Sequence, residues 1–260
     1  MSGVIKLFAS LALLCCLSGL ALSQPKLPTP EEKREAEKAW EALIRTKGGR
    51  EKLYSITNML TEYANMTTLY GFPNSEWYFA YNIDGKTPSL VIADGSKSIQ
   101  YYCSPKGLAS IAYENLTGAF DTEQLTFLLE TKWYKPEVLR VIREKEGRKE
   151  IDVIETIIGK QRVDFVYESE ELLVSEVRFY YKGNIWRKYR FSDYTDIDGI
   201  KMPTKIAYGF DVEKYAHLNH SIPIMFMLNV DYDPEIFTKP QRATTPDAWK
   251  AKKPTPLPMP

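Results

Sequence analysis

The sequence predicts an α+β fold built on a large antiparallel β-barrel that is incompletely closed, with helices packed on its concave face. After residue 56 about ten strand-like runs follow one another, with few helical segments between them and no β-α-β alternation. Aromatic residues make up 13% of the chain, a content that suits strands better than helices. So many strands rarely stay in one open twisted layer, and we therefore expect the sheet to curl.

The N-terminal segment has the layout of a secretory signal peptide. Lys6 precedes an apolar run from Leu7 to Leu17, and the small residues Ala21 and Ser23 suit a cleavage site. The alternative, a membrane anchor, needs about 20 apolar residues, and this run is shorter. We therefore predict a signal peptide over 1–23, a single barrel domain over 24–240 and a Pro-rich flexible tail over 241–260.

One amphipathic helix is predicted directly after the lead-in. Thr29 can cap it, Pro30 fits its first position, and Glu32 completes a capping box. Gly48-Gly49 ends it. Asp121–Lys132 is also expected to be helical, and a further helix around Glu137–Glu144 is a weaker expectation. The apolar stripe of the first helix consists of Ala36, Ala39, Trp40, Leu43 and Ile44.

The predicted strands are bounded by turn residues. Lys182-Gly183-Asn184 is a tight hairpin signal, and Asp198-Gly199 supplies a second turn. The predicted runs are Leu60–Tyr70, Trp77–Ile83, Leu90–Ala93, Ile99–Cys103, Val153–Ile158, Val163–Glu168, Leu173–Tyr181, Ile185–Phe191, Lys205–Phe210 and Met225–Tyr232.

Three of these runs alternate between bulky apolar and charged residues. Such a pattern puts one apolar face toward the interior, where it either fills a core or lines a cavity for an apolar ligand. The sequence leaves both possibilities open. The candidate lining residues are Trp40 and Leu43 on the helix and Trp77, Phe79, Tyr81, Phe165, Tyr167, Phe179 and Tyr181 on the strands.

Composition and motifs disfavour several functions. The 34 basic and 34 acidic residues balance, which argues against a nucleic-acid partner. Only two His residues are present, so a His-based catalytic or metal site is not expected. The common hydrolase, nucleotide and zinc motifs are missing, and Cys103 has no evident activating partner. We therefore predict no catalytic residues, no metal and no cofactor.

Three stretches together resemble a known family of bacterial exported proteins. They are Ala42–Gly49, Phe191–Ile206 and Leu228–Pro240. In order and spacing they are similar to the outer-membrane lipoprotein carrier superfamily, the LolA/LolB-like fold. The resemblance implies an unclosed antiparallel barrel with helices that cap a hydrophobic cavity, and no cofactor or catalysis.

The resemblance also implies a function. It suggests a periplasmic or secreted binding or carrier protein for a hydrophobic ligand, such as a lipid or the acyl chain of a lipoprotein. A membrane-associated delivery partner would fit that role. The alternative, from a different class, is a non-catalytic structural or sensory interaction domain whose barrel is filled by side chains.

The signal peptide yields the first prediction. Exported protein should begin near Gln24, because Ala21 and Ser23 place the cleavage site after Ser23. N-terminal sequencing of protein recovered from outside the cytoplasm checks this. Recovery of chains that still carry Met1 would contradict it.

Overall fold

The computed structural model describes ten stretches of the chain. These are residues 27–63, 66–72, 76–82, 88–94, 97–104, 107–114, 126–147, 149–168, 170–210 and 221–231. Between 76 and 114 the description covers the backbone. The predicted signal peptide and the predicted tail over 241–260 lie outside the described residues.

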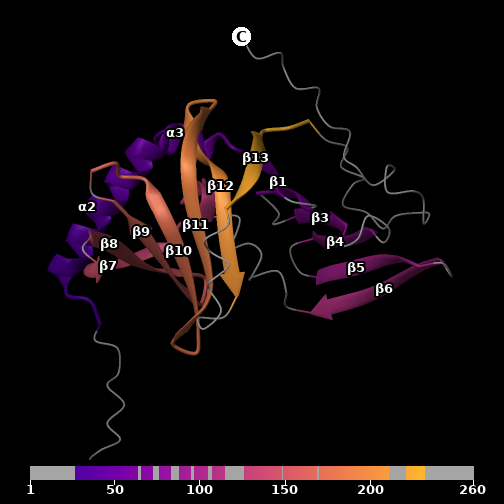
Figure 1. Cartoon of the computed structure of the whole chain (residues 1–260), viewed down its shortest axis with the longest axis horizontal. Helices are drawn as coiled ribbons and strands as arrows, with labels where there is room; N and C mark the ends of the chain where they lie inside the picture. Colours follow the sequence, from indigo (N-terminus) through magenta and orange to yellow (C-terminus); the bar gives the residue numbers. More distant parts are fainter. Residues whose placement is uncertain are drawn as a thin grey trace, which may run out of the picture.

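The described strands form one 13-stranded antiparallel sheet (Figure 1). Its order is β6-β5-β4-β3-β2-β1-β13-β12-β11-β10-β9-β8-β7. Within the described residues its two edge strands do not pair with each other, so the sheet is open, as predicted. The strands are β1 (Asn58–Tyr63), β2 (Met66–Gly71), β3 (Glu76–Asn82), β4 (Pro88–Asp94), β5 (Lys97–Ser104), β6 (Gly107–Glu114), β7 (Glu137–Glu146), β8 (Lys149–Ile158), β9 (Gln161–Tyr167), β10 (Val174–Tyr181), β11 (Asn184–Ile197), β12 (Ile200–Phe210) and β13 (Ile222–Leu228).

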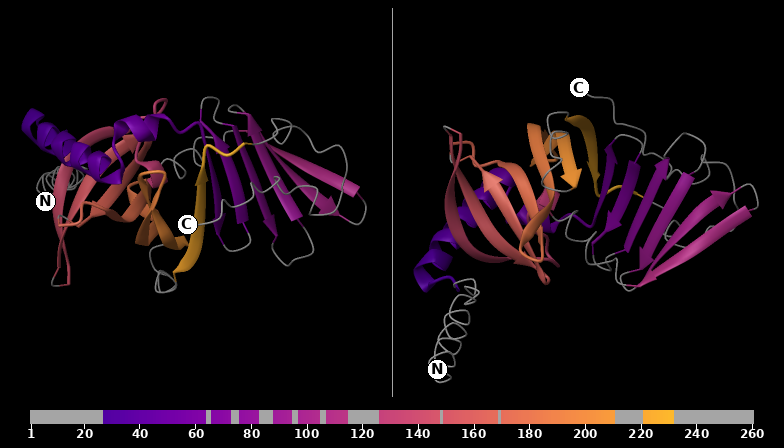
Figure 2. Two further views of the ribbon diagram at one scale, coloured as in Figure 1. Left: turned by 90° about the horizontal axis from the view of Figure 1, so that it is seen from above. Right: turned by 60° about the horizontal axis from the view of Figure 1, so that its bottom comes forward.

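The sheet has two halves that meet at a narrow joint. Within the described residues, which leave out 211–220, β12 and β13 pair through Lys205 with Pro223 and Ile206 with Ile222. Figure 2 shows helix α2 (Pro30–Lys47) against the β7–β12 half, while β3–β6 extend away from it. The first half is therefore covered by a helix, and the second is a wing beside it.

Helix α2 forms as the sequence predicts. The Thr29 side chain accepts a hydrogen bond from the Glu32 amide, and Glu32 accepts one from the Thr29 amide, which completes the capping box. Its buried residues recur every three or four positions and form one stripe. A second short helix, α3 (Arg50–Tyr54), follows. The buried stripe of α2 consists of Ala36, Trp40, Leu43, Ile44 and Lys47.

The main hydrophobic core lies between α2 and one face of the sheet, which we call the inner face. Val163, Phe165 and Tyr167 of β9 point to it, as their alternation predicts. Val177 and Phe179 of β10 pair with Phe165 and Val163 and share that face. The same core reaches β1, β2 and β13, so it spans the joint between the two halves.

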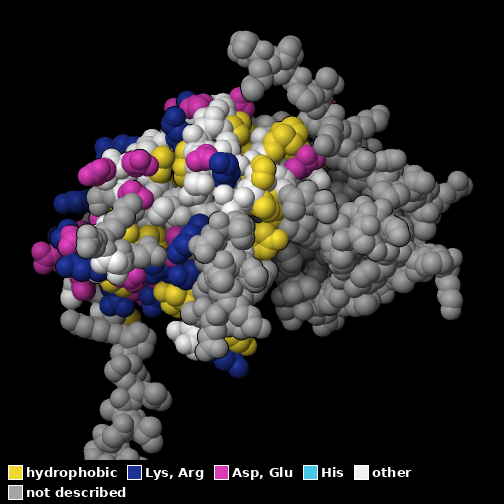
Figure 3. Space-filling view, viewed as in Figure 1, with side chains coloured by type: hydrophobic (Ala, Val, Ile, Leu, Met, Phe, Trp, Pro, Cys, Tyr) yellow, Lys and Arg dark blue, Asp and Glu magenta, His cyan; other side chains and the backbone are white. Residues whose placement is uncertain are grey.

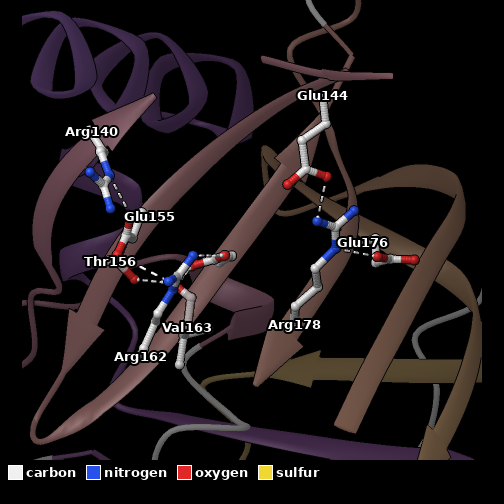
Figure 4. A network of polar contacts seen from close by, with 9 residues as sticks. Arg140, Glu144, Glu155, Thr156, Arg162, Val163, Glu176 and Arg178 are labelled. Carbon is white, nitrogen blue, oxygen red and sulfur yellow. Dashed lines mark hydrogen bonds and ion pairs between the residues drawn. The ribbon is translucent and has the colours of Figure 1, made fainter. Parts of the chain in front are cut away.

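The outer face of β7–β11 carries ion pairs instead (Figure 4). Arg178 bonds Glu176 and Glu144 at 2.7 Å each, and Arg162 bonds Asp164 at 2.8 Å. Burial opposes ionisation of Glu176, but hydrogen bonds from Arg178 and Arg190 lower its pKa. Side chains of both signs also gather over the half that holds α2 and β7–β12 (Figure 3). This outer face is therefore polar.

The predicted Gly-Gly stop does more than end the helix. Gly48 has a φ of 140° and its Cα lies against the Gly199 carbonyl, which a Cβ atom on Gly48 would strike. Gly199 belongs to the β11–β12 turn, where Asp198 and Gly199 have φ values of 54° and 77°. Two of the three stretches that carry the family resemblance thus meet in space.

The strand prediction is incomplete in two places. Leu60–Tyr70 is two strands, β1 and β2, and not one. Strands β6 and β7 were not predicted. The Lys182-Gly183 turn is confirmed, with φ values of 49° and 82°.

The helix predictions beyond α2 need correction. Glu137–Glu144 is not helical but forms most of β7, which pairs with β8 along its length. Pairing between neighbouring strands overrides the helical propensity of its Glu, Arg and Leu residues. Of the helix predicted over 121–132, the described part has one turn at 126–128, and Leu129 then adopts a left-handed φ of 69°.

A pair of neighbouring variants measures how well the interior is packed. Phe179 is 1% exposed, so Phe179→Ala should lower the free energy of unfolding by about 3–5 kcal/mol. Tyr181 on the same strand is 63% exposed, so Tyr181→Ala should cost well under about 1 kcal/mol. Urea unfolding compares the two. A small loss for Phe179→Ala would indicate an underpacked, hollow interior.

Candidate functional site

Five of the predicted lining residues lie together in the main core. Trp40 and Leu43 of α2 face Phe165, Tyr167 and Phe179 of the sheet, and all five are buried. The rings of Trp40 and Phe165 meet edge to face with centroids 5.1 Å apart. These residues fill the space between α2 and β9–β10.

Tyr181 lies elsewhere, which corrects its assignment to the interior. The extra residue of the β10–β11 bulge lies on β11, because Phe179 pairs with Arg187 and Tyr180 pairs with Ile185. Tyr181 is the last residue of β10 and lies beside the Lys182-Gly183 turn, beyond the packed core. It is 63% exposed there, and its ring lies 5.3 Å from the Lys182 ammonium.

Trp77, Phe79 and Tyr81 belong to β3, of which the backbone is described. Trp77 pairs with Tyr70 of β2, and Tyr70 pairs with Met59 of β1. Residues paired directly across antiparallel strands lie on the same sheet face. Tyr70 and Met59 belong to the main core. The register therefore places Trp77, and with it Phe79 and Tyr81, on the inner face.

The described residues enclose little empty space. A small cavity of about 10 Å³ lies between Leu43, Lys47, Phe191 and Tyr194, room for about one water molecule. Pockets that hold a small organic ligand usually have about 300 Å³ or more. A hollow of about 580 Å³ between α2 and the start of β7 is lined mostly by charged side chains and is unsuited to an acyl chain.

A buried carboxylate, Glu130, anchors α2 and α3 beside the hollow between α2 and the start of β7. It accepts hydrogen bonds from Trp40 Nε1 at 3.1 Å, Tyr54 Oη at 2.9 Å and Arg50 Nε at 2.5 Å. Arg50 also bonds Glu41 of α2. Burial opposes ionisation of Glu130, but these donors lower its pKa. The satisfied network has a structural role.

Lys47, at the end of α2, is the unusual charged residue of the inner face. Its side chain is 5% exposed and borders the small cavity. Among the described residues no carboxylate pairs with it, and its nearest favourable contact is the Tyr194 ring, 5.6 Å from Nζ. Burial lowers the pKa of Lys47 to about 7. The C-terminal end of α2 stabilises a buried cation by up to about 2 kcal/mol, which is less than the cost of the burial that lowers this pKa.

Two strained leucines border the same cavity. Leu129 has a φ of 69° and Leu172 a φ of 52°. Left-handed backbone in a residue with a bulky side chain costs on the order of 1–3 kcal/mol. Tyr194 completes the cavity wall and donates its hydroxyl to the Val174 carbonyl at 2.6 Å.

Sequence reasoning did not select Lys47, although the signal was present. Lys47 follows Ala36, Trp40, Leu43 and Ile44 at the same helical spacing, so it belongs to their stripe. The two leucine conformations left no comparable sign, because they depend on how the segments around them pack.

The described residues hold neither a metal-ligand cluster nor a helix that could span a membrane. No cluster of His, Cys, Asp and Glu there could hold a metal ion. None of the helices there is long and apolar enough to cross a membrane.

No protein-family model and no curated protein matches this sequence. Solved structures that are similar in fold include a DUF1329 family protein from Desulfovibrio piger and a LolA superfamily protein from Nitrosomonas europaea. The first is 13% identical with a TM-score of 0.48, and covers 78% of this chain and 96% of its own. The second is 16% identical with a TM-score of 0.47, and covers 78% of this chain and 97% of its own. Both likenesses concern the fold alone.

Replacing Lys47 should stabilise the protein in a pH-dependent way. Because its folded pKa of about 7 lies below the ordinary 10.5, the unfolded chain binds more protons between these pH values. Stability of the parent protein should therefore rise with pH across this window. Lys47→Met should be more stable by a few kcal/mol near pH 7, and the difference should shrink toward pH 10.

Unfolding curves of the parent and the variant at pH 6, 7, 8.5 and 10 measure this difference. The exposed Lys38 of the same helix supplies the matched control, and Lys38→Met should show no such trend. A destabilised Lys47→Met protein at pH 7 would mean that Lys47 has an anionic partner within the chain.

Proposed function

We propose that this protein is an exported, non-catalytic binding or carrier protein for a hydrophobic ligand such as a lipid or acyl chain, held on the inner face of β3 and the strands beside it. The LolA-like fold is compatible with this role. The proposal differs in one respect from a cavity between helix and sheet, because the ligand lies on the wing and not under α2.

The observation that carries the proposal is the continuity of the inner face beyond the filled core. Thr68 of β2 pairs with Phe79 of β3, Phe79 pairs with Val91 of β4, and Trp77 pairs with Ala93. Three aromatic residues of β3 thus continue the face of Met59 and Tyr70. Within the described residues, α2 packs against β7, β8 and β12 and not against this part of the sheet.

Apolar area of this kind suits a lipid for a simple physical reason. Each methylene group removed from water contributes about 0.8 kcal/mol, so an acyl chain gains most on a broad apolar surface. Aromatic side chains offer large areas at a small cost in conformational entropy. Farther along this face, β5 contributes Ser98, Gln100 and Tyr102, and the edge strand β6 contributes Ala109, Ile111 and Tyr113.

The predicted export signal agrees with a periplasmic or secreted location. A carrier of this kind would receive and release its ligand at a membrane, which calls for a membrane-associated partner.

The second candidate is a structural or sensory interaction domain with a filled barrel. The packed interior under α2 favours it, because Phe165 and Phe179 are fully buried and the enclosed space holds about one water molecule. A protein of this class would bind another protein and carry no lipid. Mass spectrometry of lipids extracted from protein purified from its own compartment separates the two candidates.

A neutral apolar dye tests the position of the site. Binding of N-phenyl-1-naphthylamine to the mature chain should weaken about tenfold in Phe79→Ala, because a large part of the apolar contact is removed. Tyr78→Ala changes the neighbouring residue of β3, whose register position is on the other face, and should bind as the parent does. Fluorescence titration measures both.

Three results would contradict the proposal. No dye binding by the parent protein together with no extracted lipid would leave the interaction domain. Loss of binding in Tyr78→Ala but not in Phe79→Ala would place the ligand on the outer face. A thermal unfolding curve for each variant controls for loss of fold.

A further inference from the structure

We infer that the small cavity at Lys47 is a second binding site, specific for a carboxylate, in which the Lys47 ammonium pairs with the anion and the surrounding apolar side chains exclude water. This inference goes beyond the proposed function, because the cavity lies between α2 and the β10–β12 strands and not on β3. The ligand chemistry is the carboxylate itself, carried either by a small anion or by an acyl chain.

The first argument is the missing counter-charge. Lys47 is 95% buried and borders the cavity, yet no carboxylate of the described residues bonds it. Of the described side chains that line the cavity, only Tyr194 titrates besides Lys47 itself, and burial raises the pKa of that phenol. Its hydroxyl hydrogen is already donated to Val174. An anion from outside the chain would therefore supply a charge that the described side chains around Lys47 do not.

The second argument is backbone strain at the same place. Leu129 and Leu172 both adopt left-handed conformations, and both border the cavity from separate segments. Strained residues of this kind persist where surrounding structure holds them and concentrate at ligand sites. The cavity has room for about one water molecule, so a carboxylate could enter only if one of these segments relaxed and enlarged it.

The side chains that line the small cavity favour a carboxylate over a phosphate. Leu43, Phe127, Leu129, Leu172 and Phe191 surround the ammonium with apolar atoms, and a single cation is present. A phosphate group carries more charge than one cation balances and needs more donors than the described wall offers. A singly charged carboxylate matches the single cation and the small number of donors in the described wall.

Isothermal titration calorimetry with three probes tests the inference. Dodecanoate, dodecanol and acetate would each be titrated into the mature protein at pH 6.5, below any micelle concentration. We expect dodecanoate to bind at least tenfold more tightly than dodecanol. Lys47→Met should remove this preference, whereas Lys38→Met should keep it. If acetate binds as tightly as dodecanoate, the carboxylate site is supported and its ligand is a small anion.

Proton uptake gives a readout that a merely structural lysine would not change. Because the free folded protein holds Lys47 largely neutral above pH 7, binding of a carboxylate at pH 8 should take up close to one proton. Titrations in two buffers of different ionisation enthalpy measure this uptake. Lys47→Met should show none.

The outcomes separate this inference from the proposed function. Equal affinity for dodecanoate and dodecanol, or a carboxylate preference that survives in Lys47→Met, would overturn the inference. Phe79→Ala should lose the neutral dye but retain the carboxylate preference, so failure of one site leaves the other measurable. A parent protein that binds neither dodecanoate nor acetate at pH 6.5 would overturn it as well.

Discussion

The packing of the α2 stripe on the inner face is the constraint on which the rest of the structure depends. A large open sheet exposes an apolar face along its whole length, and that face must be covered or used. Helix α2 covers the β7–β12 half with Trp40, Leu43 and Ile44. Since the helix ends at Gly48, against the β11–β12 turn, its reach is limited to that half. The wing formed by β3–β6 continues without it.

Charge is distributed in keeping with this division. The outer face of β7–β11 holds carboxylates and guanidinium groups that pair with one another, and Glu130 satisfies three donors where α2 and α3 meet the 126–134 segment. Buried charges of this kind are tolerated because each has a partner. Lys47 departs from the pattern. Its burial without a described partner, next to two strained leucines, marks a part of the core that is not optimised for stability.

The filled interior and the aromatic wing lead to a functional picture with two surfaces. The rings of Trp40 and Phe165 already meet, so a hydrophobic ligand would have to displace core side chains to lie under α2. The register places Trp77, Phe79 and Tyr81 of β3 on the same sheet face, and α2 makes its main described contacts elsewhere, with β7, β8 and β12. A carrier that uses the wing can keep a stable core and still offer a broad apolar surface, which a closed barrel could not.

Helices, strands and turns that depend on residues close together in the chain could be predicted from the sequence. The capping box and stripe of α2, the alternation of β9 and the Lys182-Gly183 and Asp198-Gly199 turns depend on neighbouring residues, and the structure has them as predicted. The open antiparallel sheet follows from the same patterns. Five of the nine candidate lining residues came together in one core for this reason, and β3 registers onto the same face.

Other features depend on contacts between distant segments and could be seen only in the tertiary structure. Glu137–Glu144 became strand β7 because β8 pairs with it, against its own helical propensity. Tyr181 is exposed because β10 ends there, beyond the packed core, and how well the described interior is filled depends on how closely α2 approaches the sheet. Burial of Lys47 without a described partner likewise arises only when α2, Leu172 and Tyr194 meet. Such outcomes depend on contacts between residues far apart in the chain, and periodicity within one segment carries no information about them.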